Sequence, residues 1–281
     1  ALGGLSYKEL AKEVLKDYLD NFSEEELDYC INGAYTGRFE AEEIVPVVKA
    51  GGAYFAELYH GPTAAFKDMA LSLMPYLLTT SIKKEGEEKT VVILVSTSGD
   101  TGMAALKGFE NVPGTEVVVF FPDGAVSPVQ ERQMRTASGR NAHVFSIRGN
   151  FDDAQTTQKR ILNDRQFAEE MDKKGIRFSA ANSMNIGRLI PQIVYYVWGY
   201  LRMIDQGAIA AGDEINITVP SGNFGNLLSA YYAYRMGLPV KRFICASNKN
   251  KVLTDFFHTG VYDIHRDFYV TNAPSMDILV S

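Results

Sequence analysis

Sulfur and imidazole side chains are scarce in this sequence, which narrows the chemistry that it can perform. Its two cysteines, Cys30 and Cys245, lie far apart in a chain of 281 residues. Such a pair provides neither a disulfide framework nor the spacing of a metal site, so we expect two buried thiols in a reducing cytoplasm. The 4 histidines form no HxxxH pair and no cluster with cysteine, so no catalytic metal is expected.

The sequence also has no excess of basic residues. The chain has 28 Lys and Arg residues against 34 Asp and Glu residues, which gives a formal net charge of -6. This balance argues against nucleic acid or an anionic membrane as the main partner. No apolar run approaches the roughly 20 residues that cross a bilayer, and the acidic, helical start has no signal-peptide pattern.

What the chain does contain is the composition of an ordinary globular protein. It is 46% hydrophobic and 22% charged, enough for a sizeable core in one large domain or two smaller ones. No methionine precedes Ala1, and Ser281 closes an apolar stretch. We therefore expect a fragment that is trimmed at both ends.

Short apolar runs rich in β-branched residues alternate with helical segments along most of the chain. Two helices with Ser-x-x-Glu capping boxes, at Ser6/Glu9 and Ser23/Glu26, precede the first of these runs. The spacing between runs, roughly 25 to 40 residues, is that of βαβ units, and fully apolar runs suit strands buried on both faces. The predicted fold class is therefore α/β with parallel sheet. The predicted strands are residues 53–58, 90–95, 116–121, 142–147, 177–179, 214–219 and 241–247.

Three segments carry the candidate chemistry, and the first contains Lys67 within YHGPTAAFKDMAL, residues 59–71. A lysine forms imines with aldehydes, and one that is shielded by apolar neighbours can lose its proton near neutral pH. Taken alone, Lys67 is better interpreted as a solvated surface charge. His60, in the same segment, is more easily explained by turn packing than by proton transfer.

The second and third segments are turns between a strand and a helix. STSGDTG, residues 96–102, directs backbone N–H groups and a helix start toward an anion, although simple helix capping would also explain it. PSGNFGN, residues 220–226, forms a nest of N–H groups that fits a phosphate, or else a tight turn capped by Asn226. Neither segment matches the Walker or GxGxxG pattern.

In this order, HGPTAAFKD, TSGDTG and SGNFGN resemble the pyridoxal-phosphate enzymes of the tryptophan synthase β family, and threonine synthases most closely. The resemblance continues through FFPDGAVSPVQERQM (residues 120–134) and SAANSMNIGRL (residues 179–189). Asp100 stands where related dehydratases and cysteine synthases have Asn. This difference indicates a threonine synthase of the longer type.

The resemblance implies a fold type II architecture, in which a small α/β domain is inserted in a larger one and both contain mostly parallel twisted sheets flanked by helices. The expected parts are residues 1–89, 90–178 and 179–281, with a Lys/Glu-rich link at 83–89 and the active site in a cleft between domains. It implies pyridoxal 5'-phosphate as cofactor, bound through an imine to Lys67. The cofactor phosphate would be held by Ser221, Gly222, Asn223, Phe224, Gly225 and Asn226.

The same resemblance implies conversion of O-phospho-L-homoserine and water to L-threonine and phosphate, with Lys67 moving the protons. The substrate carboxylate would be bound by Ser96, Thr97, Ser98, Gly99, Asp100 and Thr101, with Asp100 also near the cofactor ring. A dianionic substrate needs a second anion site, for which the chain offers Asn182, Ser183, Asn185 and Arg188. A capped helix with a solvated Arg188 is an equally good interpretation, and Lys107, Lys159 and Arg160 are other candidates.

Some questions stay open at the level of the sequence. In the family, the group that contacts the pyridine nitrogen comes from a later segment, beyond Ser281. A non-catalytic binding protein and a serine/threonine dehydratase are the alternatives to a threonine synthase. Family members are monomers or homodimers. The aromatic cluster at residues 195–200 is predicted to be a buried helix face rather than a binding platform.

Overall fold

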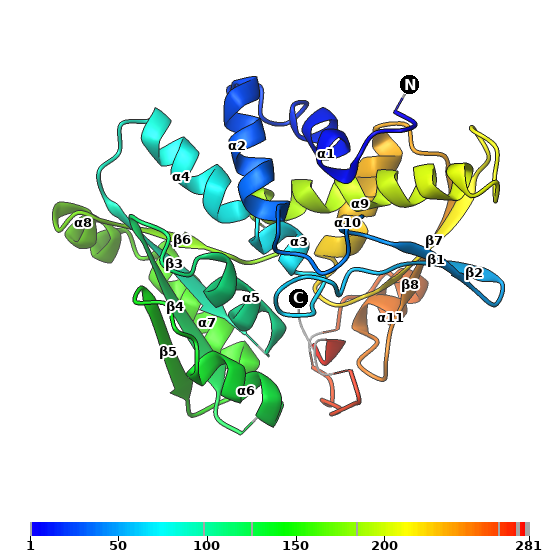
Figure 1. Cartoon of the computed structure of the whole chain (residues 1–281). Helices are drawn as coiled ribbons and strands as arrows, with labels where there is room; N and C mark the ends of the chain where they lie inside the picture. The colour runs from blue at the N-terminus through cyan, green and yellow to red at the C-terminus, as the bar shows by residue number, and fades with distance from the viewer. Residues whose placement is uncertain are drawn as a thin grey trace.

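The computed structural model describes residues 2–97, 99–124, 126–183, 185–263, 265–273 and 276–278. Helices and strands alternate along the described chain (Figure 1). The helices are α1 (Tyr7–Leu15), α2 (Glu24–Tyr35), α3 (Asp68–Leu71), α4 (Met74–Lys84), α5 (Asp100–Gly108), α6 (Pro128–Arg135), α7 (Phe151–Asn163), α8 (Arg165–Lys173), α9 (Ile186–Asp205), α10 (Gly225–Arg235) and α11 (Val252–Thr259). The strands are β1 (Val47–Ala50), β2 (Ala53–Ala56), β3 (Thr90–Ser96), β4 (Thr115–Pro122), β5 (Ala142–Ile147), β6 (Ile176–Ala180), β7 (Ile215–Pro220) and β8 (Val240–Ala246).

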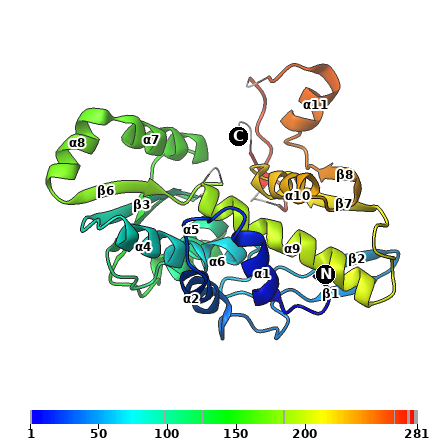
Figure 2. The ribbon, with the colours of Figure 1, turned by 90° about the horizontal axis from the view of Figure 1, so that it is seen from above.

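A four-stranded parallel sheet, in the order β5-β4-β3-β6, organises the middle of the chain. Helices α7 and α8 lie on one face of this sheet and α5 and α6 on the other (Figure 2). Its central strand β3 buries Val91, Ile93 and Val95 almost completely. Because helices cover both faces, the strand needs apolar residues at nearly every position, which explains the run VVILV.

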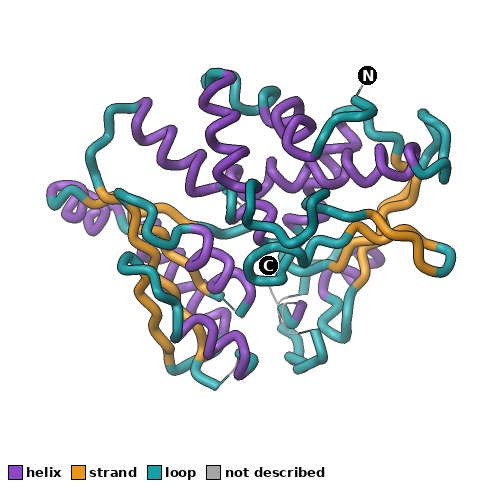
Figure 3. Tube along the Cα trace, viewed as in Figure 1, coloured by secondary structure: helices purple, strands orange, loops and turns teal. Residues whose placement is uncertain are grey.

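The remaining elements build a second, mainly helical part around α9. Helices α1, α3, α4 and α10 pack on α9, and β1 contacts it from the hairpin that β1 and β2 form (Figures 1 and 3). Strands β7 and β8 pair in parallel beside α10. Tyr195, Trp198 and Tyr200 of α9 are buried. The prediction of a buried aromatic helix face is therefore confirmed.

Each part has its own cluster of buried apolar side chains, here called the α9 core and the β3 core. Ile193 and Trp198 belong to the α9 core, and Ile93 and Phe121 to the β3 core. Leu71 packs in the β3 core although it precedes the sheet in sequence. Two separate apolar cores are what a chain with two domains would contain. The division at residues 1–89, 90–178 and 179–281 stays a prediction.

Local signals in the sequence give most of these elements correctly. Both capping boxes are present, since Ser6 and Ser23 accept from the backbone of Glu9 and Glu26, whose side chains bond back to the caps. The expected parallel pairing of strands is also confirmed. Strand β1 was not predicted, because only its first residue is buried and its sequence shows no alternation. Within the described residues, no helix combines the length and the apolar character that a membrane crossing requires.

Candidate active site

Lys67 lies directly before α3, at the end of a loop that a buried carboxylate holds in place. Asp68, the first residue of α3, is 1% exposed, and its Oδ2 and Oδ1 accept from the backbone and hydroxyl of Thr63, at 2.7 and 2.6 Å. Within this loop Ala64 has a φ of 55°, a conformation that a non-glycine residue rarely adopts. Burial raises the pKa of Asp68 against the effect of these hydrogen bonds. The Asp68–Thr63 contacts therefore fix the place of Lys67.

The Lys67 amine is paired with the carboxylate of Asp100, across the contact between α3 and α5. Its Nζ lies 2.9 Å from Asp100 Oδ2, and the two side chains are 12% and 23% exposed. Burial lowers the pKa of Lys67, the charge of Asp100 opposes this effect, and the charge of Arg188 adds to it. The amine thus releases its proton more readily than a surface lysine.

Gln130 of α6 is a contact of Asp100 that sequence reasoning did not identify. Its Nε2 donates a hydrogen bond to Asp100 Oδ1, and its Oε1 accepts from Ser127. The same side chain lies against Gly99, whose φ is 142° and where a Cβ would come within 2.1 Å of Gln130 Oε1. Gln130 lies within the segment at residues 120–134 that carries the family resemblance, but its contact with Asp100 depends on how α6 packs against α5 and was not predicted.

The loop at residues 96–101 uses two of its predicted hydroxyls inside the fold. Ser96 Oγ donates to the carbonyl of Ala154 at 2.9 Å. Thr97 is 1% exposed, and its Oγ1 accepts from the N–H groups of Gly99 and Gly102, both at 2.9 Å. Capping by Thr97 therefore accompanies any ligand binding here. Thr101 is partly exposed in the first turn of α5, and Ser98 lies outside the described residues.

The loop at residues 220–226 leads into a helix start without a side-chain cap. Gly222 has a φ of 44° and Phe224, the N-cap of α10, has a φ of 64°. Ser221 is buried, and its N–H donates to the carbonyl of Ala246 at 2.7 Å. Among the described residues, no acceptor in the chain takes the backbone N–H of Gly222, Asn223, Gly225 or Asn226. Such a set of free N–H groups is suited to an anion.

Arg188 lies in the first turn of α9 and is buried, so the alternative interpretation, a solvated side chain, is wrong. It is 4% exposed, its Nη1 donates to the carbonyl of Ala181 at 2.8 Å, and burial lowers its pKa to about 10. Its Nε is buried without a partner among the described residues. A buried cation with an unused donor is costly, and an anionic ligand would relieve that cost.

The other members of this predicted anion site have defined contacts. Asn185 caps α9, since its Oδ1 accepts from Gly187 at 2.8 Å and its Nδ2 donates to Ala180. Asn182 Oδ1 accepts from Gln158 at 3.0 Å. Ser183 lies against Gly225, where a Cβ would come within 3.0 Å of Ser183 Cβ. The turn before α9 is therefore adjacent to the start of α10.

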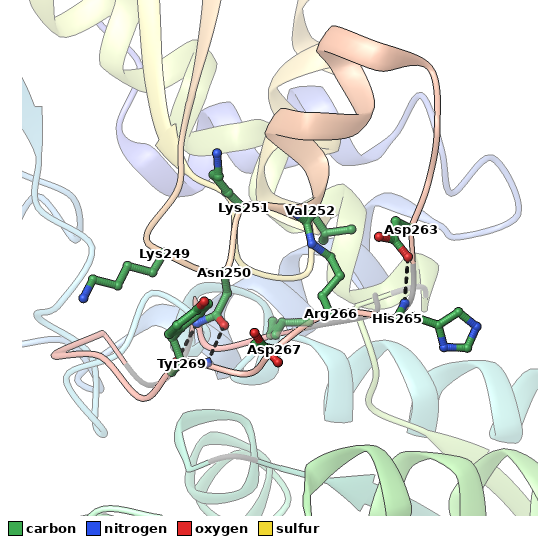
Figure 4. Close-up of a pocket in the computed structure, with 10 residues that line it drawn as sticks. Lys249, Asn250, Lys251, Val252, Asp263, His265, Arg266, Asp267 and Tyr269 are labelled. Carbon is green, nitrogen blue, oxygen red and sulfur yellow. Dashed lines mark hydrogen bonds between the residues drawn. The ribbon is translucent and has the colours of Figure 1, made fainter.

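A hollow with a volume of about 980 Å³ lies where the segment after α11 returns to the chain (Figure 4). Its described lining residues are Lys249, Asn250, Lys251, Val252, Asp263, His265, Arg266, Asp267, Tyr269 and Ile278. Lys67 is not among them, so the predicted cleft between domains stays a prediction. His60, also outside this hollow, lies 2.8 Å from Glu57, a local contact that agrees with turn packing.

Comparison with known proteins identifies the family. The family model described as "Pyridoxal-phosphate dependent enzyme" matches residues 40–279. The chain belongs to this family. Within the family it is similar to threonine synthases and threonine synthase-like proteins, and its fold is that of the fold type II enzymes, as the resemblance implies.

Solved and curated relatives of the pyridoxal-phosphate family give the extent of this similarity. The pyridoxal-phosphate-bound threonine synthase of Brucella melitensis superposes with a TM-score of 0.86 at 37% identity, over 100% of this chain and 58% of that one. Human threonine synthase-like 1 is 40% identical over 100% of this chain and 39% of its own length. The threonine synthase of Pseudomonas aeruginosa is 38% identical over 99% and 57%, respectively. The chain thus spans about two to three fifths of these relatives.

The residues of the site fit the family's cofactor chemically. Pyridoxal phosphate carries an aldehyde, which needs an amine that is neutral near physiological pH, and a phosphate, which needs several hydrogen-bond donors. Lys67 supplies an amine that is more readily neutral than that of a surface lysine, because burial lowers its pKa. The uncapped start of α10 supplies the second. The fit rests on these two features of the chain itself.

Proposed function

We propose that the protein is a threonine synthase, which uses pyridoxal phosphate to convert O-phospho-L-homoserine and water to L-threonine and phosphate. The observation that carries the proposal is the buried Lys67 amine, with Asp100 Oδ2 at 2.9 Å and its pKa lowered by burial. The cofactor, when bound, supplies an electron sink for carbanions next to the amino group. We place this activity in the cytoplasm.

Lys67 has two roles in this proposal. Its amine bonds to the cofactor aldehyde, and once released by the substrate it moves protons at the substrate carbons. A proton carrier must exist in both charge states near neutral pH. Burial favours the neutral amine, and Asp100 stabilises the ammonium form. The pair therefore brings the two states of Lys67 closer in free energy than for a lysine in water.

Separate groups of the chain bind the anionic parts of cofactor and substrate. We assign the cofactor phosphate to the loop at residues 221–226, whose free N–H groups need an acceptor. Arg188, buried with an unused Nε, is assigned to the substrate phosphate, together with Asn182, Ser183 and Asn185. The substrate carboxylate is assigned to the loop at residues 96–101. Since the hydroxyls and backbone N–H groups of Ser96 and Thr97 and the N–H of Gly99 have partners in the chain, Thr101 is the donor of this loop that we assign to the carboxylate.

A second candidate function is a threonine synthase-like protein that keeps the cofactor site without this reaction. The 40% identity to human threonine synthase-like 1 favours it. A dehydratase acting on unphosphorylated serine or threonine is a third. The buried, incompletely bonded Arg188 argues against the dehydratase, whose substrate carries no phosphate. In each case we expect a monomer or a homodimer.

The test of the proposed function combines a spectrum with a reaction. The purified whole protein, supplied with pyridoxal phosphate, should absorb in the visible range, and borohydride should fix the cofactor to Lys67. It should also release phosphate and form threonine from O-phosphohomoserine. The Lys67→Ala variant should lose all three properties, whereas Lys84→Ala, which removes a side chain paired with Glu26, should keep them.

The outcomes separate the candidates. Fixation of the cofactor without phosphate release would favour the threonine synthase-like binding protein. Ammonia release from serine or threonine would favour the dehydratase. A colourless protein whose Lys67 stays unmodified would overturn the assignment of the cofactor.

A further inference from the structure

Two tyrosines of α9 contact Asn226, at the start of α10, the helix to which we assign the cofactor phosphate. The Oδ1 of Asn226, in the first turn of α10, accepts from the hydroxyl of Tyr195 at 2.6 Å and from that of Tyr196. The Tyr196 hydroxyl also lies 3.1 Å from the backbone carbonyl oxygen of Asn226. These contacts join residues that are 30 and 31 positions apart in the chain.

Both hydroxyls keep their protons under ordinary conditions. Burial raises the pKa of Tyr195 well above its usual value, and burial also raises that of Tyr196. Because two hydroxyls converge on Oδ1, the side-chain amide of Asn226 can take only one of its two orientations. Its Nδ2 is then directed away from the tyrosines, and no acceptor within the described chain takes its hydrogens.

A series of close contacts leads from Asn226 back to the first turn of α9. The Tyr195 hydroxyl, whose one proton is donated to Asn226, also lies 3.0 Å from Gln192 Oε1, and Gln192 Nε2 donates to the carbonyl of Arg188 at 2.5 Å. The start of α10, assigned to the cofactor phosphate, is thereby tied to the turn that carries Arg188. Further along α10, Ser229 Oγ lies 2.9 Å from the carbonyl oxygen of Gly225 in the same helix and 3.1 Å from that of Leu189 in α9. The two helices also pack against each other, so their contact does not depend on the tyrosine hydroxyls alone.

We propose that Tyr195 and Tyr196 are positioning residues for the phosphate nest, a step that rests on the proposed function. They act through Asn226, whose place determines how the free N–H groups at the start of α10 are aimed. A preorganised set of donors binds an anion more tightly than one that must first be ordered. The tyrosines therefore strengthen binding of an aldehyde that carries a phosphate and leave an aldehyde without one unaffected.

The experiment compares pyridoxal phosphate with pyridoxal, titrated by absorbance into the whole protein. The double variant Tyr195→Phe/Tyr196→Phe should bind pyridoxal phosphate roughly tenfold more weakly than the wild type, because it loses the hydrogen bonds to Asn226. Its affinity for pyridoxal should equal that of the wild type. The control is Tyr200→Phe. It removes a hydroxyl of the same helix that lies 3.2 Å from the carbonyl of Asp213 and should change neither affinity.

A double-mutant cycle with Asn226→Ala shows whether the tyrosines act through that residue. In the Asn226→Ala background, loss of the Tyr195 hydroxyl, whose contact with residue 226 is with the side chain, should cost no further affinity for pyridoxal phosphate. The ³¹P resonance of the bound cofactor should shift in Tyr196→Phe, a readout that general loss of stability would not produce. If the double variant does not fold, the affinity and the ³¹P shift of Tyr196→Phe serve as the test of the inference.

Three results would overturn the inference while leaving the proposed function intact. They are an unchanged affinity for pyridoxal phosphate, an equal loss for pyridoxal, or fully additive effects with Asn226→Ala. A wild-type protein that binds neither aldehyde would instead overturn the proposed function itself.

Discussion

Two opposing effects act on the Lys67 amine, and the net direction of its pKa shows which is larger. The Asp100 carboxylate, 2.9 Å away, favours the ammonium form, while burial favours the neutral amine. Burial prevails, so the pKa of Lys67 is lowered. An ion pair in a site largely removed from water does not by itself raise the pKa of a lysine above its usual value.

Removing the carboxylate should lower the pKa of Lys67 further. Imines form with the neutral amine, so in Asp100→Asn the pH midpoint for imine formation with pyridoxal phosphate should move to lower pH. Absorbance titrations at a series of pH values measure this midpoint. Asp172→Asn, which removes an exposed partner of Lys89, should leave it in place. A midpoint that moves upward in Asp100→Asn would show that the charge of Asp100 does not act on Lys67.

At the scale of elements, α5 contacts α3 closely at both ends. Asp100 begins α5 and pairs with Lys67, and Gly108 ends it beside the backbone of Leu71. A Cβ on Gly108 would come within 2.1 Å of the Leu71 carbonyl oxygen. Because residue 108 has no side chain, α5 can approach α3 and Lys67 closely.

Gly108→Ala should push α5 away from α3. We expect a loss of about 1–3 kcal/mol in the free energy of unfolding, as for other forced insertions into packed structure. Urea denaturation measures it. Gly199→Ala, in α9, is the matched control because a Cβ there would have no neighbour within 4 Å. That change should raise the free energy of unfolding by up to about 1 kcal/mol. Equal effects of both changes would contradict the close-contact argument.

The sequence predicts those features of the elements that depend on neighbours in the chain. Strand β3 is apolar along its length because helices cover both faces of its sheet, and Ser23 caps α2 through a residue three positions later. Features set by distant packing escape prediction. The burial of Arg188 and the contact of Gln130 with Asp100 depend on which helices meet, and no local pattern encodes them.

At the scale of the whole molecule, the site draws on both cores. Asp100 comes from the part built around the β3 core, whereas Arg188 comes from a helix of the α9 core. The Lys67 segment lies between them, since α3 contacts both α5 and α9 (Figure 1). A ligand that touches all three would bind only when both parts are folded and in place.

Two isoleucines, each 0% exposed, allow a matched test of whether the cores are independent. Ile93→Ala removes volume from the β3 core and Ile193→Ala from the α9 core, and each should cost about 2–5 kcal/mol. Hydrogen exchange should show faster exchange of amides mainly in the core that carries the change. If both variants lose protection equally throughout the molecule, the two cores form one cooperative unit. Addition of pyridoxal phosphate should slow exchange in both cores.

Phe224 at the start of α10 shows how the demands of stability and of ligand binding can differ at one position. With a φ of 64°, it adopts a left-handed conformation that costs an ordinary residue roughly 1–2 kcal/mol and a glycine almost nothing. Selection for stability alone would favour glycine there. Phe224 instead places its ring 6.2 Å from that of Phe257, measured between ring centres. A substitution that stabilises the fold here would therefore also change the loop to which we assign the cofactor phosphate.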